Sequence, residues 1–132
     1  MRKNVPTAEE LASVKGDRTM SQGFVAQYAA EAALQTEGVA ELETSFAAIF
    51  KESFGVEHEG KGVRVQYERE NEGFVTITVY PVIYYGSILP EVAWSIQEHV
   101  KADVERYTGL HVEAVNVHVR DIIPPPADSG GE

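Results

Sequence analysis

The chain has 132 residues, with 11 lysines and arginines against 21 aspartates and glutamates, which gives a formal net charge of −10. Affinity for phosphate groups needs a basic surface, so this balance argues against nucleic-acid binding. The length suits one domain with a real hydrophobic core. Because the chain has no cysteine, disulfides, thiolate nucleophiles and thiolate metal sites are excluded.

The sequence also predicts where the protein works and how it is divided. No stretch reaches the roughly 18 consecutive apolar residues of a membrane span, and no signal-like apolar stretch follows the basic first residues. We therefore expect a cytoplasmic protein with no direct membrane span. We predict a flexible N-terminal arm at 1–15, a folded domain at 16–123 and a disordered Pro/Gly tail at 124–132.

The first half of the domain predicts helices. From Ser21 to Thr36 the chain is rich in alanine, with apolar residues at helical spacing, and Gly38 stands where a helix ends. After Val39 a second amphipathic run predicts an extra helical segment that Gly55 ends. The stripe of that segment consists of Leu42, Phe46, Ile49 and Phe50.

The second half predicts a hairpin, a long helix and a third strand. Apolar and polar residues alternate over 63–68 and again over 75–80, on either side of a turn sequence, which indicates a β-hairpin. Pro81 favours an edge or a bulge there. Residues 89–107 carry a helical stripe that Thr108-Gly109 ends, and 115–119 alternate as a strand. The stripe consists of Leu89, Val92, Ala93, Ile96, Val100, Val104 and Tyr107.

The element order is therefore α-β-β-α-β, with an extra helical segment before the hairpin. Helices that bury one stripe and strands that bury one face pack best as two layers. We predict an α+β two-layer sandwich in which helices cover one face of a three-stranded sheet. The order of the strands stays open.

No catalytic or metal site assembles from the sequence. Residues 55–62 match most of a phosphate-binding loop, but they end in Gly62 and lead into a strand, so we interpret them as a connection. His111 and His118 are expected on opposite faces of one strand, away from the other two histidines. Ser87 has no nearby base and is expected to cap the long helix. We expect no enzyme activity, no catalytic residue, no cofactor and no metal.

Two surfaces are candidates for binding. Trp94 lies off the apolar stripe between Glu91 and Glu98, either as an anchor for a partner or packed over the N-terminal arm or the middle helix. The acidic residues between Glu31 and Glu72 are interpreted as a solvated face. Solvation is also favoured for the outward sheet face, which comprises Thr76, Thr78, Tyr80, Asn116, His118 and Arg120.

Several ordered stretches resemble the C-terminal signature of the bacterial alkaline shock protein family. They are Gly86-Ser87-Ile88-Leu89-Pro90-Glu91-Val92-Ala93, Ile96-Gln97, Val100-Lys101, Thr108-Gly109-Leu110 and Val115-Asn116-Val117-His118-Val119. Upstream, the family's first helix, its exit turn and its entry to the hairpin are similar to Tyr28-Ala29-Ala30-Glu31-Ala32-Ala33, Glu37-Gly38-Val39 and Lys61-Gly62-Val63. The resemblance covers roughly 16 to 123.

The resemblance implies a small, non-enzymatic cytoplasmic protein of the envelope stress response. Such proteins are often held at the membrane by a membrane-anchored partner and are prone to self-association, while some relatives are linked to control of lipid synthesis. The family supplies no catalytic residues. The chain departs from the family pattern at Arg18-Thr19-Met20 and over 41–54, which is more helical and aromatic than the usual Gly-rich linker.

We therefore expect an interaction module that binds a membrane-anchored protein, itself, or both. Our candidate partner-binding residues are Trp94, Phe46, Phe50, Phe54 and Asn116. The alternative is a regulatory protein that binds a small acyl or lipid-related molecule in a groove between the middle helix and the sheet.

Overall fold

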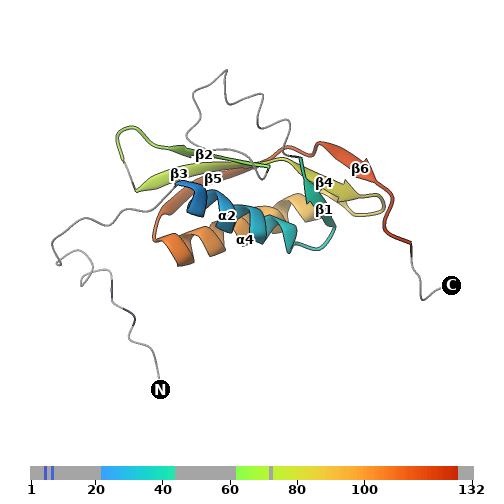
Figure 1. Cartoon of the computed structure of the whole chain (residues 1–132), viewed down its shortest axis with the longest axis horizontal. Helices are drawn as coiled ribbons and strands as arrows, with labels where there is room; N and C mark the ends of the chain where they lie inside the picture. The colour runs from blue at the N-terminus through green and yellow to red at the C-terminus, as the bar shows by residue number, and fades with distance from the viewer. Residues whose placement is uncertain (1–4, 6, 8–21, 44–61, 72, 128–132) are drawn as a thin grey trace.

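The computed structural model describes residues 5, 7, 22–43, 62–71 and 73–127 (Figure 1). Within these residues there are two helices and six strands, and both helices lie on one face of the strands. The predicted α+β architecture of two layers is confirmed. The elements are α2 (Gln22–Leu34), β1 (Val39–Leu42), β2 (Val63–Tyr67), β3 (Phe74–Val79), β4 (Pro81–Tyr84), α4 (Leu89–Thr108), β5 (His111–Val117) and β6 (Asp121–Ile123).

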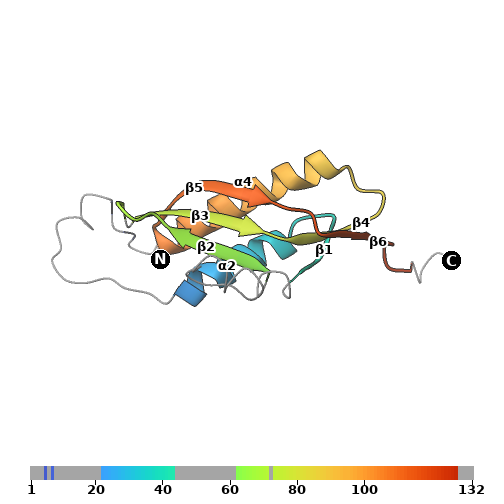
Figure 2. The ribbon, with the colours of Figure 1, turned by 90° about the horizontal axis from the view of Figure 1, so that it is seen from above.

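The strands form two three-stranded sheets, whose central strands, β3 and β4, follow each other directly in the chain. β2 and β5 flank β3, and β1 and β6 flank β4. The pairs with β2 and β1 are antiparallel, and those with β5 and β6 are parallel. Tyr80, between β3 and β4, donates its N–H to the Gly62 carbonyl at 3.1 Å and accepts the Glu43 N–H at 2.8 Å. β2 and β1 therefore share one edge, and β5 and β6 share the other (Figure 2).

The prediction of a single three-stranded sheet missed β1, β4 and β6. These strands have only three or four residues each. In β4, Pro81, Val82 and Ile83 are all buried, so the alternation that reveals a half-exposed strand is absent. Pro81 cannot donate a hydrogen bond, but its carbonyl accepts the Arg120 N–H at 2.8 Å, which keeps it within the sheet.

Leu42 was assigned to the wrong kind of element. It ends strand β1, where it pairs with Pro81, instead of lying on a helical stripe. The physical reason is that residues Val39 to Leu42 pair with β4, and this tertiary pairing outweighs their weak helical pattern. The rest of the predicted extra helical segment lies outside the described residues.

Glycine allows the two pieces of one sheet edge to meet. Gly62 has a φ of +75°, and a Cβ atom there would overlap Leu42. The residues on either side of 44–61, Glu43 and Gly62, therefore lie against each other beside Tyr80. β1 and β2 are successive parts of one edge, although they are far apart in the sequence.

The core lies between the strands and the helices. α2 contributes mostly alanines, which let it approach the strands closely, while α4 contributes a row of larger side chains. The buried residues of α2 are Val25, Ala26, Ala29, Ala30, Ala32 and Ala33; those of α4 are Val92, Ile96, Val100 and Val104; and those of β2 and β3 include Val63, Val65, Val75, Ile77 and Val79.

The two helices run antiparallel and are joined at both ends. At one end the rings of Tyr28 and Tyr107 stack with centroids 5.1 Å apart. At the other, the Thr36 hydroxyl donates to the Ala32 carbonyl at 3.0 Å, and His99 Nδ1 lies 2.9 Å from the same hydroxyl oxygen. Thr36 therefore links the end of α2 to α4 through the His99 ring.

The start of α4 differs from the prediction, while its end agrees with it. Ile88 is the N-cap, without a side-chain hydrogen bond, so the capping role expected for Ser87 is wrong. Ser87 stands one residue earlier, in a turn where its N–H bonds the Tyr84 carbonyl at 3.2 Å. At the other end Gly109, with a φ of +78°, donates its N–H to the Glu105 carbonyl at 3.1 Å.

Candidate functional site

Strand β5 lies at a sheet edge, and side chains of α4 bond the outward backbone groups of its first part. Lys101 Nζ donates to the Val112 carbonyl at 3.0 Å, and the Val112 N–H donates to Glu105 Oε2 at 2.9 Å. Gln97 Nε2 donates to the Val115 carbonyl at 3.0 Å. We call Val112 and Val115 with these three side chains the capped edge. Its backbone groups are occupied, so another strand cannot pair there.

Glu105 is the electrostatic centre of the capped edge. Burial alone would raise the pKa of this carboxyl group, but the hydrogen bonds from Lys101 and the Val112 N–H, with the nearby charges of Lys101 and His111, hold its pKa below the ordinary value. Lys101 Nζ lies 2.9 Å from Glu105 Oε2, and His111 Nδ1 lies 3.6 Å from the same oxygen. The carboxylate is therefore charged at neutral pH.

Beyond Val115 this capping stops. The N–H groups of His118 and Arg120 turn inward and donate to the carbonyls of Val79 and Pro81 at 2.9 and 2.8 Å. In an extended chain successive residues direct their backbone groups to alternate sides, so Val117 and Val119 direct their N–H and C=O groups away from β3 and β4. No group in the described part of the chain bonds these outward atoms.

The first turns of α4 are also uncovered on this side. Leu89 continues the apolar stripe of Val92 and Ile96 but is 37% exposed, and Trp94 is 62% exposed. Figure 2, which views the strands from above, shows these turns beside the strands and not beneath them. α4 and β5 run antiparallel, since Lys101 meets Val112 and Gln97 meets Val115. Trp94, one turn before Gln97, therefore lies toward the residues after Val115.

We call this region the open edge and define it by the backbone of Val117 and Val119 with the side chains of Leu89 and Trp94. It joins an unpaired strand edge to an uncovered helical stripe. Trp94 was predicted from the sequence, but the backbone beside it was not. Only the alternation of Val115, Val117 and Val119 hinted at a strand there, and periodicity does not reveal which strands lie at an edge.

Of the other candidate residues only Asn116 is described, and it does not join Trp94. Asn116 lies on the face opposite the helices, where its Nδ2 donates to Thr78 Oγ1 of the neighbouring strand at 3.4 Å. Phe46, Phe50 and Phe54 lie outside the described residues. Among the described candidates, Trp94 and Asn116 therefore lie on different faces of the molecule.

Comparison with known proteins places the chain in a family. Residues 10–124 match the family model of the alkaline shock proteins, which is described as having a cell envelope-related function. The chain belongs to this family. The sequence resemblance is therefore confirmed.

Two relatives from Bacillus subtilis (strain 168) are similar to this chain. The uncharacterized protein YqhY is 36% identical over 88 residues, which are 67% of this chain and 63% of YqhY. The uncharacterized protein YloU is 29% identical over 115 residues, which are 86% of this chain and 93% of YloU. The chain thus spans less than two thirds of YqhY.

Solved structures are only weakly similar to this alkaline shock family member. A MamM CTD in a manganese form has a TM-score of 0.41 and 19% identity over 75% of this chain and 96% of that one. A MamM CTD in a zinc form has a TM-score of 0.43 and 18% identity over 75% of this chain and 84% of that one. Neither likeness supports a conclusion about function. In the described part of the chain, no helix is long and apolar enough to span a bilayer.

The histidines of this family member are arranged differently from the prediction. In the pairing of β3 with β5, Val75 faces Val112 and Thr76 faces Ala114, so Glu113 is an extra residue. This bulge shifts the alternation, and the expectation that His111 and His118 point to opposite faces is wrong.

The two histidines nevertheless stay far apart. The His111 ring lies 4.5 Å from that of Phe74, and the His118 ring lies 5.8 Å from that of Tyr80. Phe74 and Tyr80 are six residues apart along nearly one strand, a distance of roughly 20 Å. Among the described residues no group of three metal-ligating side chains comes together.

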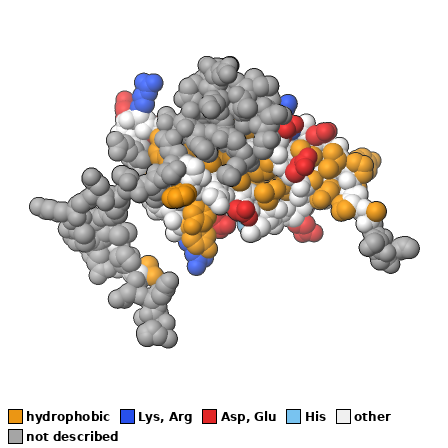
Figure 3. Space-filling view, in the orientation of Figure 1, with side chains coloured by type: hydrophobic (Ala, Val, Ile, Leu, Met, Phe, Trp, Pro, Cys, Tyr) orange, Lys and Arg blue, Asp and Glu red, His pale blue; other side chains and the backbone are white. Residues whose placement is uncertain are grey.

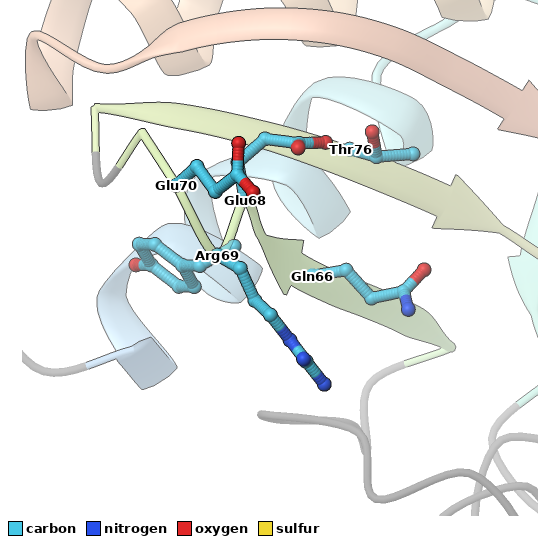
Figure 4. Close-up of a pocket in the computed structure, with 6 residues that line it drawn as sticks. Gln66, Glu68, Arg69, Glu70 and Thr76 are labelled. Atoms are coloured by element: carbon cyan, nitrogen blue, oxygen red, sulfur yellow. The ribbon is translucent and has the colours of Figure 1, made fainter.

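The outward sheet face is less solvated than the sequence suggested. Thr78 and Tyr80 are only 2% and 1% exposed, whereas Asn116, His118 and Arg120 are exposed. Near the hairpin end of this face lies an open hollow of about 490 Å³ (Figure 4). Its side chains do not converge: Arg69 extends to one side and the carboxylates of Glu68 and Glu70 to the other. This hollow therefore offers no enclosed apolar site for an acyl chain.

A second exposed apolar surface was not predicted from the sequence. Phe24 and Tyr28 of α2 and Tyr107 of α4 are exposed on the outer side of the helical layer, and the Arg106 guanidinium lies 5.6 Å from the Tyr107 ring centre. Figure 3 shows hydrophobic side chains at this surface and at the end formed by β4 and β6. The signal in the sequence was that Phe24, Tyr28 and Leu34 fall outside the alanine-rich buried face of α2, on the same side as Gln27 and Glu31.

Proposed function

We propose that this chain is a non-enzymatic interaction module of the bacterial envelope stress response, which works on the cytoplasmic side of the membrane through a membrane-anchored protein. The observation that carries the proposal is the exposure of Trp94 at the open edge. Large aromatic side chains dominate the energetics of protein interfaces, and Trp94, the single tryptophan of the chain, keeps 62% of its surface exposed. Membership of an envelope-related family supports the same location.

Membrane vesicles from the organism that encodes the chain would test this function. We expect the purified chain to bind native vesicles, to bind far less to vesicles whose exposed proteins have been removed by protease, and not to bind liposomes of the extracted lipids. With a charge of −10 the chain is repelled by anionic lipid, so a protein must supply the attachment. Equal binding to liposomes and to native vesicles would reject the proposal.

Self-association is the second part of the proposed function. The exposed aromatic surface of Phe24, Tyr28 and Tyr107 supports it, because a second copy would remove these rings from water. We expect the mass in light scattering to rise with concentration from the monomer value of 14.5 kDa. Phe24→Ser should weaken the rise, while the matched variant Gln66→Ser, on the hairpin, should not. A constant monomer mass would reject this part.

A further inference from the structure

We propose that the open edge accepts an extended, basic segment of a partner protein as an additional β-strand, with Trp94 as its anchor. This proposal rests on the proposed function and specifies the chemistry of the partner. It follows from three features that meet at one place: unpaired backbone groups, an uncovered helical stripe and local negative charge.

The backbone determines that the ligand is a strand. The outward N–H and C=O groups of Val117 and Val119 have no partner in the described part of the chain, while the equivalent groups of Val112 and Val115 are bonded by Gln97, Lys101 and Glu105. Alternating donors and acceptors along an edge match the main chain of an extended peptide and not a helix, whose backbone groups are already bonded. The capped edge limits the addition to the residues after Val115.

The helix beneath provides the surface on which such a strand would pack. β5 covers α4 from Gln97 onward, as its hydrogen bonds with that helix show. The first turns lie beside the strands (Figure 2), and Leu89 keeps 37% of its surface exposed although it continues the buried stripe. A strand added beyond Val119 would extend the sheet over these turns. Its inward side chains would cover Leu89 and reach past it toward Trp94, which projects from the same flank of α4 as Lys101 and Glu105.

The charges beside Trp94 favour a basic segment. Glu91 and Glu98 lie one turn before and one turn after Trp94, and all three side chains are exposed. A lysine or arginine placed there meets two carboxylates and the face of the indole ring, which attracts cations. A second copy of this chain brings the same two carboxylates and a net charge of −10, so it is a poorer occupant than a basic partner.

Synthetic peptides test the proposal directly. The probe is a short peptide of Lys-Lys-Val-Val repeats, in which each face of an extended strand carries both lysine and valine, labelled for fluorescence anisotropy and added to the full chain. Two further peptides have the same sequence and charge but carry N-methyl groups on alternate residues, in the two possible phases. An added strand turns every second N–H toward β5, so we expect one phase to lose affinity by at least about tenfold and the other to bind as the parent does.

We also expect peptide binding to depend on charge, both in the peptide and beside Trp94. A peptide of glutamate and valine should not bind measurably. Glu91→Gln with Glu98→Gln should weaken binding of the lysine peptide by about tenfold, whereas the matched pair Glu68→Gln with Glu113→Gln should leave it unchanged. Because the chain has one tryptophan, a change in its fluorescence reports contact at Trp94 itself.

Val119→Pro supplies a test from the protein side. It removes one outward N–H and leaves the inward bonds of His118 and Arg120, so we expect it to weaken binding as N-methylation does. Two results obtained with the unmodified protein would overturn the proposal. One is equal affinity for the two N-methylated peptides, and the other is Trp94 fluorescence that does not change when the peptide saturates the protein. If Val119→Pro still binds native vesicles as the unmodified chain does, the proposed function stands and this proposal fails.

Discussion

The two halves of α4 carry one continuous apolar stripe but have different surroundings. From Gln97 to Thr108 the helix lies under β5, and its flank is tied to the strand by Gln97, Lys101 and Glu105. From Leu89 to Val92 the same stripe continues beside the strands, and on the strand edge next to it the outward backbone groups of Val117 and Val119 have no partner in the described region. A sheet edge and a helix face are thus left uncovered together.

This difference shows that an amphipathic pattern predicts which face of a helix is apolar. It does not predict how much of that face is covered by strands. The stripe of α4 is longer than the strands above it. Where β5 lies over α4, the side chains of Gln97, Lys101 and Glu105 bond the outward backbone groups of the strand. Where no strand of the described region lies over the helix, the indole ring of Trp94 stays exposed. We interpret the first half of α4 as the place where the fold is finished by another protein.

The largest effect should come from the centre of the stripe. Ile96 is fully buried, so Ile96→Ala should lower the free energy of unfolding by about 2–5 kcal/mol through lost transfer energy and a cavity. Leu89→Ala, on the same stripe but partly exposed, should cost less than about 1 kcal/mol. Urea denaturation measures both. Equal losses would show that the first turn is covered as fully as the middle.

The next largest effect on the free energy of unfolding should come from the contact between Gly38, which follows α2, and Val92 in the first turns of α4. Gly38 and Gly86 share a φ of +98°, but a Cβ on Gly38 would lie 2.9 Å from Val92 Cγ2, and one on Gly86 would meet nothing within 4 Å. Gly86→Ala should cost about 1–2 kcal/mol from backbone strain alone. Gly38→Ala should cost about 2–4 kcal/mol, because overpacking against α4 adds to the strain. Similar unfolding free energies would show that Val92 moves freely aside.

The capped edge should make stability depend on acid. Because the pKa of Glu105 is lowered on folding, its contribution is present above the ordinary carboxyl pKa of about 4.3 and is lost as the pH falls through the lower folded value. With 31% of its side chain exposed, we expect at most about 1 kcal/mol.

Glu105→Gln should remove this acid dependence, and the Val112 amide should then exchange faster with solvent. The matched variant Glu113→Gln, on the bulge of the same strand, should change neither. Stability measured by urea denaturation at several pH values, with amide exchange by NMR, gives both readouts. An unchanged acid dependence in Glu105→Gln would mean that other carboxyl groups produce it.

The smallest effect on stability is expected at the largest side chain of the open edge. Trp94→Ala should change the free energy of unfolding by less than about 0.5 kcal/mol, because the ring already keeps 62% of its surface in water. A core role for this residue would cost roughly 3 to 5 kcal/mol. Thermal and urea denaturation of this variant distinguish the two interpretations, since a loss of that size would show that Trp94 supports the fold.

Much of the fold could be predicted because its signals are local. The alanine-rich helix, the hairpin and the stripe of α4 each repeat over many residues, and Gly109 ends its helix by a local rule. The short strands gave no such signal: β4 is buried throughout, and β1 takes up a run in which Leu42 fitted a helical pattern. For the candidate site, the sequence supplied Trp94 as an unplaced aromatic residue but not the strand edge next to it.

The sequence by itself determined the apolar faces of the helices, the hairpin, the net charge and the family. Each of these depends on residues near one another in the chain or on composition. Only the tertiary structure decided that β1 and β2 share an edge, that a bulge at Glu113 places His111 and His118 on one face, and that the capping of β5 stops after Val115. These features depend on which strands become neighbours and on how far β5 extends over α4. Residues far apart in the chain decide both, so no local pattern of side chains contains that information.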